Sequence, residues 1–260
     1  MFKKILIITF LFNFTFAKCQ NTDLYEKEIF VYENDTLNYR ILKPNNYDPK
    51  KKYPLHLFLH GAGERGNDNQ SQLVHGAKLF LKKENREKFN SWVIFPQCKT
   101  NDRWPSFKFD TWNAEPKYNS DDIEPNPSLK LVIKLMDDFV NKVQVNKNKV
   151  YVSGLSMGGM GTFEILSRRP EMFAAATPIC GNGIEKLTEI YAKKVPIWIF
   201  HGSDDTVVSP SHSLKMANAI IKNGGSPRIT FYENVGHDSW NNAFEEKDFL
   251  EWIHSKSKQQ

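Results

Sequence analysis

The sequence predicts an α/β protein with a mostly parallel central sheet and helices on both faces. Short apolar runs of strand length alternate along the chain with segments of helical spacing, which is the pattern of a sheet built from strand–helix units. Breaker residues separate these segments, such as Pro170 after one predicted helix and the pair Gly224 and Gly225 after another.

Apolar periodicity and turn residues place the individual elements. The first two strands, at 28–32 and 36–42, are separated by a short turn at 33–35 and are expected to be antiparallel. Further strands are expected at 53–59, 92–95, 149–152, 174–179, 195–200 and 228–232. Helical spacing predicts helices at 71–83, 128–145, 157–169, 211–223 and 241–254.

The first twenty residues have the pattern of a signal peptide. Two lysines near the initiating methionine precede an apolar run at 5–17, which is too short to cross a membrane. Two cleavage points fit, one near 17–19 and one after Gln20, and Cys19 is an alternative lipidated first residue. We therefore expect an exported protein, periplasmic, extracellular or lipid-anchored, in which residues 21–260 form a single domain.

Composition argues against several classes of partner. Residues 1–20 carry three lysines and no acidic residue, so the formal net charge falls from +5 to +2 without them. The sequence has no dense basic cluster of the kind that binds nucleic acid. It has no second apolar run long enough to cross a bilayer, and no C-x-x-C or Cys/His cluster that would indicate structural zinc.

A candidate nucleophile, Ser156, lies between a predicted strand and a predicted helix. The pentapeptide at 154–158 matches G-x-S-x-G. This pattern alone is weak evidence, but the strand at 149–152 and the helix beginning at Met157 give it the context of a nucleophile elbow. Such a turn holds the serine in a strained conformation, with its hydroxyl clear of the sheet.

A serine hydroxyl needs a base that takes its proton. Among the histidines after Ser156, His237 follows the last predicted strand and precedes the closing helix, at the edge of the sheet where ligands bind. His201 ends a strand ahead of the predicted acid loop, and His212 and His254 look solvent-facing on helices. We therefore expect His237 to be the base.

The acid that orients this base is expected in the loop after the strand at 195–200. Two adjacent residues of that loop, Asp204 and Asp205, compete for the role. Asp204 could instead support the turn by accepting hydrogen bonds from backbone N–H groups. Composition and spacing leave both open.

Backbone N–H groups at two places are candidates for an oxyanion hole. One belongs to Met157, directly after the serine, and the other to the glycine-rich segment 59–66, where Ala62 is the expected donor. This chemistry requires neither a metal nor an organic cofactor.

The segment 97–127 has no clear period and contains four prolines and five aromatic residues. A long irregular loop in a compact domain is often functional. This one is either a surface loop pinned by its aromatic side chains or a wall of the substrate pocket. Trp104 and Trp112 of the loop, together with Trp240, are candidates for an aromatic substrate pocket.

Six stretches of the chain, in order, resemble the bacterial secreted esterases related to feruloyl esterases and polyhydroxybutyrate depolymerases. They are residues 59–66, 96–98, 152–159, 178–181, 201–208 and 236–240.

The resemblance implies the α/β-hydrolase fold and a set of roles. It implies Ser156 as nucleophile, His237 as base, and Ala62 and Met157 as oxyanion donors. In this group the pattern H-G-x-x-D-x-x-V puts the acid four residues after the histidine, which implies Asp205.

The expected function is hydrolysis of carboxylic esters through an acyl-enzyme, with a small-molecule or polysaccharide-linked ester as substrate. A serine peptidase and an acyltransferase are alternatives that use the same triad. A non-catalytic, glycan-binding surface protein is an alternative of another class, and the intact set of Ser156, Asp205 and His237 argues against it.

The sheet order of the group also bears on the two cysteines after the signal peptide. Cys98 and Cys180 would follow strands separated by two others, or about 14 Å at the usual strand spacing. A disulfide requires Cα atoms within about 7 Å. We therefore expect free thiols.

Overall fold

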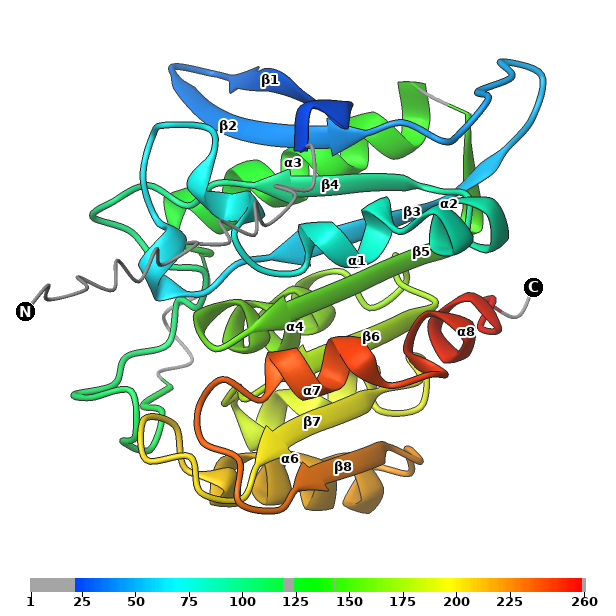
Figure 1. The fold of residues 1–260 in the computed structure, drawn as a ribbon. Helices are drawn as coiled ribbons and strands as arrows, with labels where there is room; N and C mark the ends of the chain where they lie inside the picture. Colours follow the sequence, from blue (N-terminus) through cyan, green and yellow to red (C-terminus); the bar gives the residue numbers. More distant parts are fainter. Residues whose placement is uncertain (1–21, 119–123, 143, 259–260) are drawn as a thin grey trace, which may run out of the picture.

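The computed structural model describes residues 22–118, 124–142 and 144–258. The predicted signal peptide and Cys19 lie outside the described residues. Within these ranges, one sheet contains eight strands (Figure 1). The strands are β1 (Tyr25–Tyr32), β2 (Asp35–Leu42), β3 (Tyr53–Leu59), β4 (Trp92–Pro96), β5 (Val145–Leu155), β6 (Ala175–Ile179), β7 (Trp198–Gly202) and β8 (Arg228–Tyr232).

The strand order across the sheet is β1-β2-β4-β3-β5-β6-β7-β8. β1 pairs antiparallel with β2, and β2 pairs antiparallel with β4. All pairs from β4 to β8 are parallel. The mostly parallel sheet with two antiparallel entry strands, predicted from the sequence, is therefore confirmed.

Helices cover both faces of the sheet (Figure 1). One face carries α1 (Ala77–Leu81), α2 (Lys83–Lys88), α7 (Trp240–Glu245) and α8 (Phe249–His254). The other carries α3 (Pro127–Lys142), α4 (Met157–Arg168), α5 (Thr188–Tyr191) and α6 (Pro210–Lys222). Four short 3-10 turns complete the described elements: η1 (Thr22–Leu24), η2 (Ala62–Glu64), η3 (Ser71–Leu73) and η4 (Glu185–Leu187).

The alternation of side chains along each strand builds one apolar core on each face. On β3, Leu55 and Leu57 belong to the core that contains α3, α4 and α6. Phe58, from the same strand, belongs to the opposite core with α1, α7 and α8. Strands buried on both faces explain why the predicted strands are continuous apolar runs.

Three of the predicted helices differ from the structure, and the short helix α5 was not predicted. The helix predicted at 71–83 is interrupted because Gly76 has φ +80°, and a Cβ there would lie 2.6 Å from the Phe58 ring. The closing helix predicted at 241–254 is divided into α7 and α8, with Glu246 in an extended conformation between them. The helix predicted at 128–145 ends at 142, because Val145 already pairs with Tyr53 in the sheet.

Cys98 follows β4 and Cys180 follows β6, and the strand order places β3 and β5 between them. Both thiols are free and buried. None of the helices in the described ranges combines the length and apolar character needed to cross a membrane.

Candidate active site

Ser156 occupies a sharp turn between β5 and α4. Its backbone has φ 53° and ψ −118°, a left-handed region that non-glycine residues enter at a cost of about 1–3 kcal/mol. Its N–H donates to the Ile179 carbonyl at 2.9 Å, which fixes the turn against β6. A Cβ at Gly158 would lie 1.9 Å from the Leu59 carbonyl oxygen, so only glycine permits α4 to begin this close to β3.

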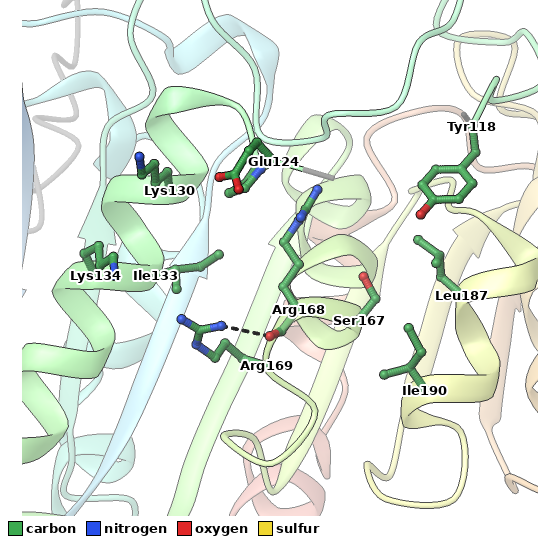
Figure 2. A pocket seen from close by; sticks show the side chains of 11 residues that line it. Tyr118, Glu124, Lys130, Ile133, Lys134, Ser167, Arg168, Arg169, Leu187 and Ile190 are labelled. Carbon is green, nitrogen blue, oxygen red and sulfur yellow. Dashed lines mark hydrogen bonds between the residues drawn. The ribbon is translucent and has the colours of Figure 1, made fainter. Parts of the chain in front are cut away.

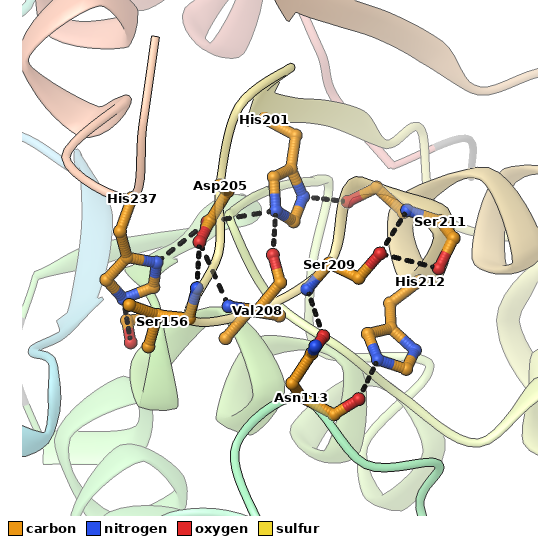
Figure 3. A network of polar contacts seen from close by, with 11 residues as sticks. Asn113, Ser156, His201, Asp205, Val208, Ser209, Ser211, His212 and His237 are labelled. Atoms are coloured by element: carbon orange, nitrogen blue, oxygen red, sulfur yellow. Dashed lines mark hydrogen bonds and ion pairs between the residues drawn. The ribbon is translucent and has the colours of Figure 1, made fainter.

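His237 and Asp205 continue from Ser156 as a chain of hydrogen bonds (Figure 3). The distance from Ser156 Oγ to His237 Nε2 is 2.9 Å, and that from His237 Nδ1 to Asp205 Oδ2 is 2.7 Å. Because a carboxylate only accepts, Nδ1 carries the proton, which leaves Nε2 to accept from the serine hydroxyl. Asp204, the competing acid, is exposed and instead accepts a hydrogen bond from the Ser203 hydroxyl at 2.8 Å.

The Asp205 carboxylate has four hydrogen-bond donors. The N–H groups of Val207 and Val208 each donate to Oδ1 at 2.9 Å. The rings of His237 and His201 contact Oδ2. Burial alone would raise the pKa of Asp205, but the hydrogen bonds from both histidines and the Val208 N–H outweigh it and hold this pKa well below its usual range. The acid is therefore charged at neutral pH.

His201 is a component of the site that sequence reasoning placed only at a strand end. It is fully buried, and its Nε2 lies 2.8 Å from the Val208 carbonyl oxygen and 3.2 Å from Asp205 Oδ2. Since the carbonyl only accepts, Nε2 carries a proton that both oxygens share. The Ser213 hydroxyl, 2.7 Å from Nδ1, completes the contacts of the ring. The H-x-x-x-D spacing was the signal that could have identified this contact.

A network centred on His60 supports the segment that holds the second predicted oxyanion donor. His60 Nδ1 lies 2.6 Å from the Gly61 carbonyl, and the Cys98 N–H donates to His60 Nε2 at 2.9 Å. The Trp104 indole N–H donates to the His60 carbonyl at 2.9 Å. Burial lowers the pKa of His60 to about 4, so the ring is neutral. Ala62 follows this anchor as the first residue of η2.

The two predicted oxyanion donors flank Ser156. Ala62 lines the same cavity as Ser156, and a Cβ on neighbouring Gly61 would lie 3.7 Å from the serine Cβ. Met157 is the first residue of α4, where helix N–H groups lack partners within the helix and the dipole favours a negative charge. The turn and the η2 segment thus meet at Ser156.

A cavity of about 180 Å³ opens at these residues. Trp112 and Trp240 line it, and the rings of Trp240 and His237 meet edge to face at 5.5 Å. Trp104 corrects the sequence expectation: it is fully buried in the core and does not line this cavity. Sequence reasoning also missed four side chains of the cavity wall, those of Glu64, His75, Leu155 and Val207.

The segment bearing Trp112 is attached to the loop that supplies Asp205 (Figure 3). The side chain of Asn113 accepts the Ser209 N–H at 2.8 Å, and its backbone carbonyl accepts from His212 Nε2 at 3.1 Å. His212 is buried, so its expected solvent-facing position is wrong: the long loop covers it. His254 also packs inward, with its ring 5.0 Å from that of Tyr151. In the described part of this loop, Trp112 lines the cavity and Trp104 packs in the core.

Cys180 lies beside Asp205 and His237. Its sulfur, a carboxylate oxygen of Asp205 and a ring nitrogen of His237 all lie within 4.8 Å of one another. The group is poorly suited to a metal ion. Burial raises the pKa of the Cys180 thiol well above its usual range, which opposes the thiolate form that binds metals. The Nδ1 and Oδ2 atoms already share a hydrogen bond.

These features define the class of the protein: a parallel sheet with a serine at the turn after its central strand, and an acid and a histidine in later loops, is an α/β-hydrolase fold. Residues 124–250 match the Dienelactone hydrolase family.

Individual relatives include esterases and a depolymerase. A bifunctional acetylxylan esterase/xylanase of Neocallimastix patriciarum is 28% identical over 65% of this chain and 21% of its own length. The poly(3-hydroxyalkanoate) depolymerase C of Paucimonas lemoignei is 26% identical over 61% of this chain and 42% of its own length. The crystal structure of a thermostable esterase superposes with a TM-score of 0.82 and 33% identity, over 91% of this chain and 64% of that chain.

These relatives confirm the resemblance to esterases and depolymerases. The chain spans less than half the length of the two curated relatives and about two thirds of the solved esterase.

Proposed function

We propose that this protein is a serine esterase that hydrolyses carboxylic esters through an acyl-enzyme. The observation that carries the proposal is the continuous hydrogen-bond chain from Ser156 Oγ through His237 to Asp205, with distances of 2.9 and 2.7 Å. It opens into a cavity beside the η2 segment. An activated serine next to backbone N–H donors is the arrangement that acyl transfer needs.

In the first step, His237 Nε2 takes the hydroxyl proton as Ser156 Oγ attacks the ester carbonyl carbon. The N–H groups of Ala62 and Met157 donate to the resulting oxyanion. His237 then gives its proton to the departing alcohol oxygen as the carbon–oxygen ester bond breaks. The Asp205 carboxylate, charged and held by four donors, stabilises the imidazolium throughout.

In the second step, His237 takes a proton from water, whose oxygen attacks the acyl carbon. The tetrahedral intermediate collapses to release the carboxylic acid, and the proton returns to Ser156 Oγ. Every proton movement uses groups of this chain, so the proposed mechanism involves no cofactor.

The proposed substrate is an ester of a small molecule or of a polysaccharide, a class that the acetylxylan esterase relative acts on by its name. The pattern of residues 1–20 supports export, and we propose that residues 21–260 form the hydrolase domain. Trp112 and Trp240 are the proposed substrate contacts.

A panel of substrates tests this function: short and long nitrophenyl esters, methyl ferulate, acetylated xylan and a peptide anilide, each with wild type and Ser156→Ala. We expect ester turnover by wild type and a loss of about 10⁴-fold or more in kcat for Ser156→Ala, because the nucleophile is removed. Turnover of the anilide alone would assign a peptidase. Ester hydrolysis that survives in Ser156→Ala would rule out the mechanism.

A further inference from the structure

Two ionisable side chains of the active-site cavity have no part in the acyl-transfer steps. Glu64 is the last residue of η2, and His75 lies just before Gly76 and α1. Both line the cavity together with Ser156 and His237. A Cβ on Gly61 would lie 3.0 Å from a Glu64 carboxylate oxygen and 3.7 Å from the Ser156 Cβ, so carboxylate and nucleophile flank the same point.

The Glu64 carboxylate is largely enclosed and lacks a donor. Its side chain is 13% exposed, and His75 faces it, with Nε2 3.7 Å from Oε1. That separation is too long for a hydrogen bond. Among the described residues no other group donates to this carboxylate, whereas the buried Asp205 receives four donors. The Glu64 oxygens are not among the buried, unpartnered atoms of the described residues, so water or a ligand in the cavity can donate to them.

The chemistry of the pair indicates what fits between its members. Glu64 only accepts hydrogen bonds, and the His75 ring offers an N–H. A hydroxyl group both donates and accepts, so it can satisfy both at once. An ammonium group can donate to Glu64 and to the unprotonated nitrogen of a neutral His75 ring, so substrates with a free amine are the competing outcome that the test below separates.

An aromatic surface adjoins the pair. The rings of His75 and Trp240 are 5.1 Å apart, and Trp240 also meets His237. Trp112 lines the same cavity. Hydroxyl-binding side chains beside a flat apolar face match a sugar, which presents hydroxyls at its edge and C–H groups on its face.

We propose that Glu64 and His75 form a subsite for the hydroxyl groups of a sugar, which is the alcohol part of the ester that Ser156 cleaves. This inference rests on the proposed esterase function and narrows it to carbohydrate esters. The subsite binds the alcohol part of the ester and takes no part in the transfer of the acyl group.

The test compares two acetyl esters that deliver the same acyl group to Ser156. One is an acetylated xylo-oligosaccharide, and the other is nitrophenyl acetate, which has no sugar hydroxyl. We expect Glu64→Gln and His75→Phe each to lower the ratio of kcat/KM for the sugar ester to that for nitrophenyl acetate by about tenfold or more. Glu87→Gln, at an exposed carboxylate on α2, is the matched control and should keep the wild-type ratio.

A second measurement reports binding without turnover of a sugar ester. Deacetylated xylo-oligosaccharide should inhibit nitrophenyl acetate hydrolysis competitively, with a Ki that rises about tenfold in Glu64→Gln. A merely structural role would lower both rates together and leave the ratio unchanged, which would overturn the subsite. The subsite would also be overturned if wild type cleaved nitrophenyl acetate but no sugar ester. A Glu64-dependent preference for substrates with a free ammonium group would overturn it as well. Failure of wild type on every ester would instead overturn the proposed function itself.

Discussion

The two ends of helix α4 offer two cavities of different character. The N-terminal end carries Ser156 and the cavity of about 180 Å³. The C-terminal end, about 18 Å away at 1.5 Å per helical residue, carries Arg168 and borders a cavity of about 430 Å³ (Figure 2). The larger cavity contains none of the residues that the mechanism uses.

The two ends of α4 differ in how the polar side chains around them are arranged. Around Ser156, side chains from separate loops converge, and both carboxylate oxygens of Asp205 accept hydrogen bonds. Around the larger cavity, the arginines form separate ion pairs: Arg168 with Glu164 at 2.7 Å, and Arg169 with Asp137 of α3 at 3.0 Å. A strained, convergent arrangement therefore identifies the reactive end better than volume does.

The largest expected effect follows from replacing the acid. Asp205→Asn should lower kcat for ester hydrolysis by about 10³- to 10⁴-fold, because an amide no longer stabilises the imidazolium or fixes the proton on Nδ1 of His237. Steady-state kinetics on nitrophenyl acetate measure this loss.

Asp204→Asn is the matched control, since it makes the same chemical change at the adjacent, exposed residue. It should change kcat less than about threefold. If Asp204→Asn lowered kcat as much as Asp205→Asn, Asp205 could not be assigned as the acid. The convergent hydrogen bonds of Asp205 would then no longer distinguish the two ends of α4.

A smaller effect concerns stability against acid near the η2 segment. His60 has its pKa lowered to about 4 by burial, against 6.5 ordinarily. Between these pH values His60 is protonated in the unfolded chain but neutral in the folded chain. The free energy of unfolding therefore decreases as the pH falls from 6.5 towards 4. Relative to pH 7, the loss from His60 should be about 2 kcal/mol at pH 4.5.

Urea unfolding at pH 7 and pH 4.5 checks this, with His60→Gln as the comparison. Glutamine can accept from the Cys98 N–H as His60 Nε2 does, but it does not titrate. The variant should lose less stability than wild type over the same pH interval. Parallel losses in the two proteins would show that protonation of His60 does not limit acid stability.

The sequence allows prediction of those parts of the site that depend on local pattern. The strand-to-helix turn predicted Ser156 at the tip, because a continuous apolar strand and a glycine-rich helix start are both local signals. The position of His237 between the last strand and the closing helix is also local. The choice of Asp205 over Asp204 required the resemblance, because two adjacent aspartates have the same composition.

The remaining parts depend on contacts between distant residues, which no local pattern encodes. The helix predicted at 71–83 is interrupted at Gly76, where φ is +80° and where the ring of Phe58, eighteen positions earlier in the chain, leaves no room for a Cβ. Trp104 and Trp112 belong to the same loop and look alike in sequence, but one enters the core and the other lines the cavity. Glu64 and His75 meet only through tertiary packing.

The smallest expected effect tests the other end of α4. Arg169 and Asp137 are each more than a third exposed in their side chains, so solvent screens their ion pair. A double-mutant cycle with Arg169→Met and Asp137→Asn should give a coupling energy below about 1 kcal/mol in urea unfolding. Both variants should keep kcat/KM on nitrophenyl acetate within about twofold of wild type, because no group of the triad contacts them. A loss of tenfold or more in a folded variant would show that the larger cavity contributes to turnover, and the contrast between the two ends would then fail.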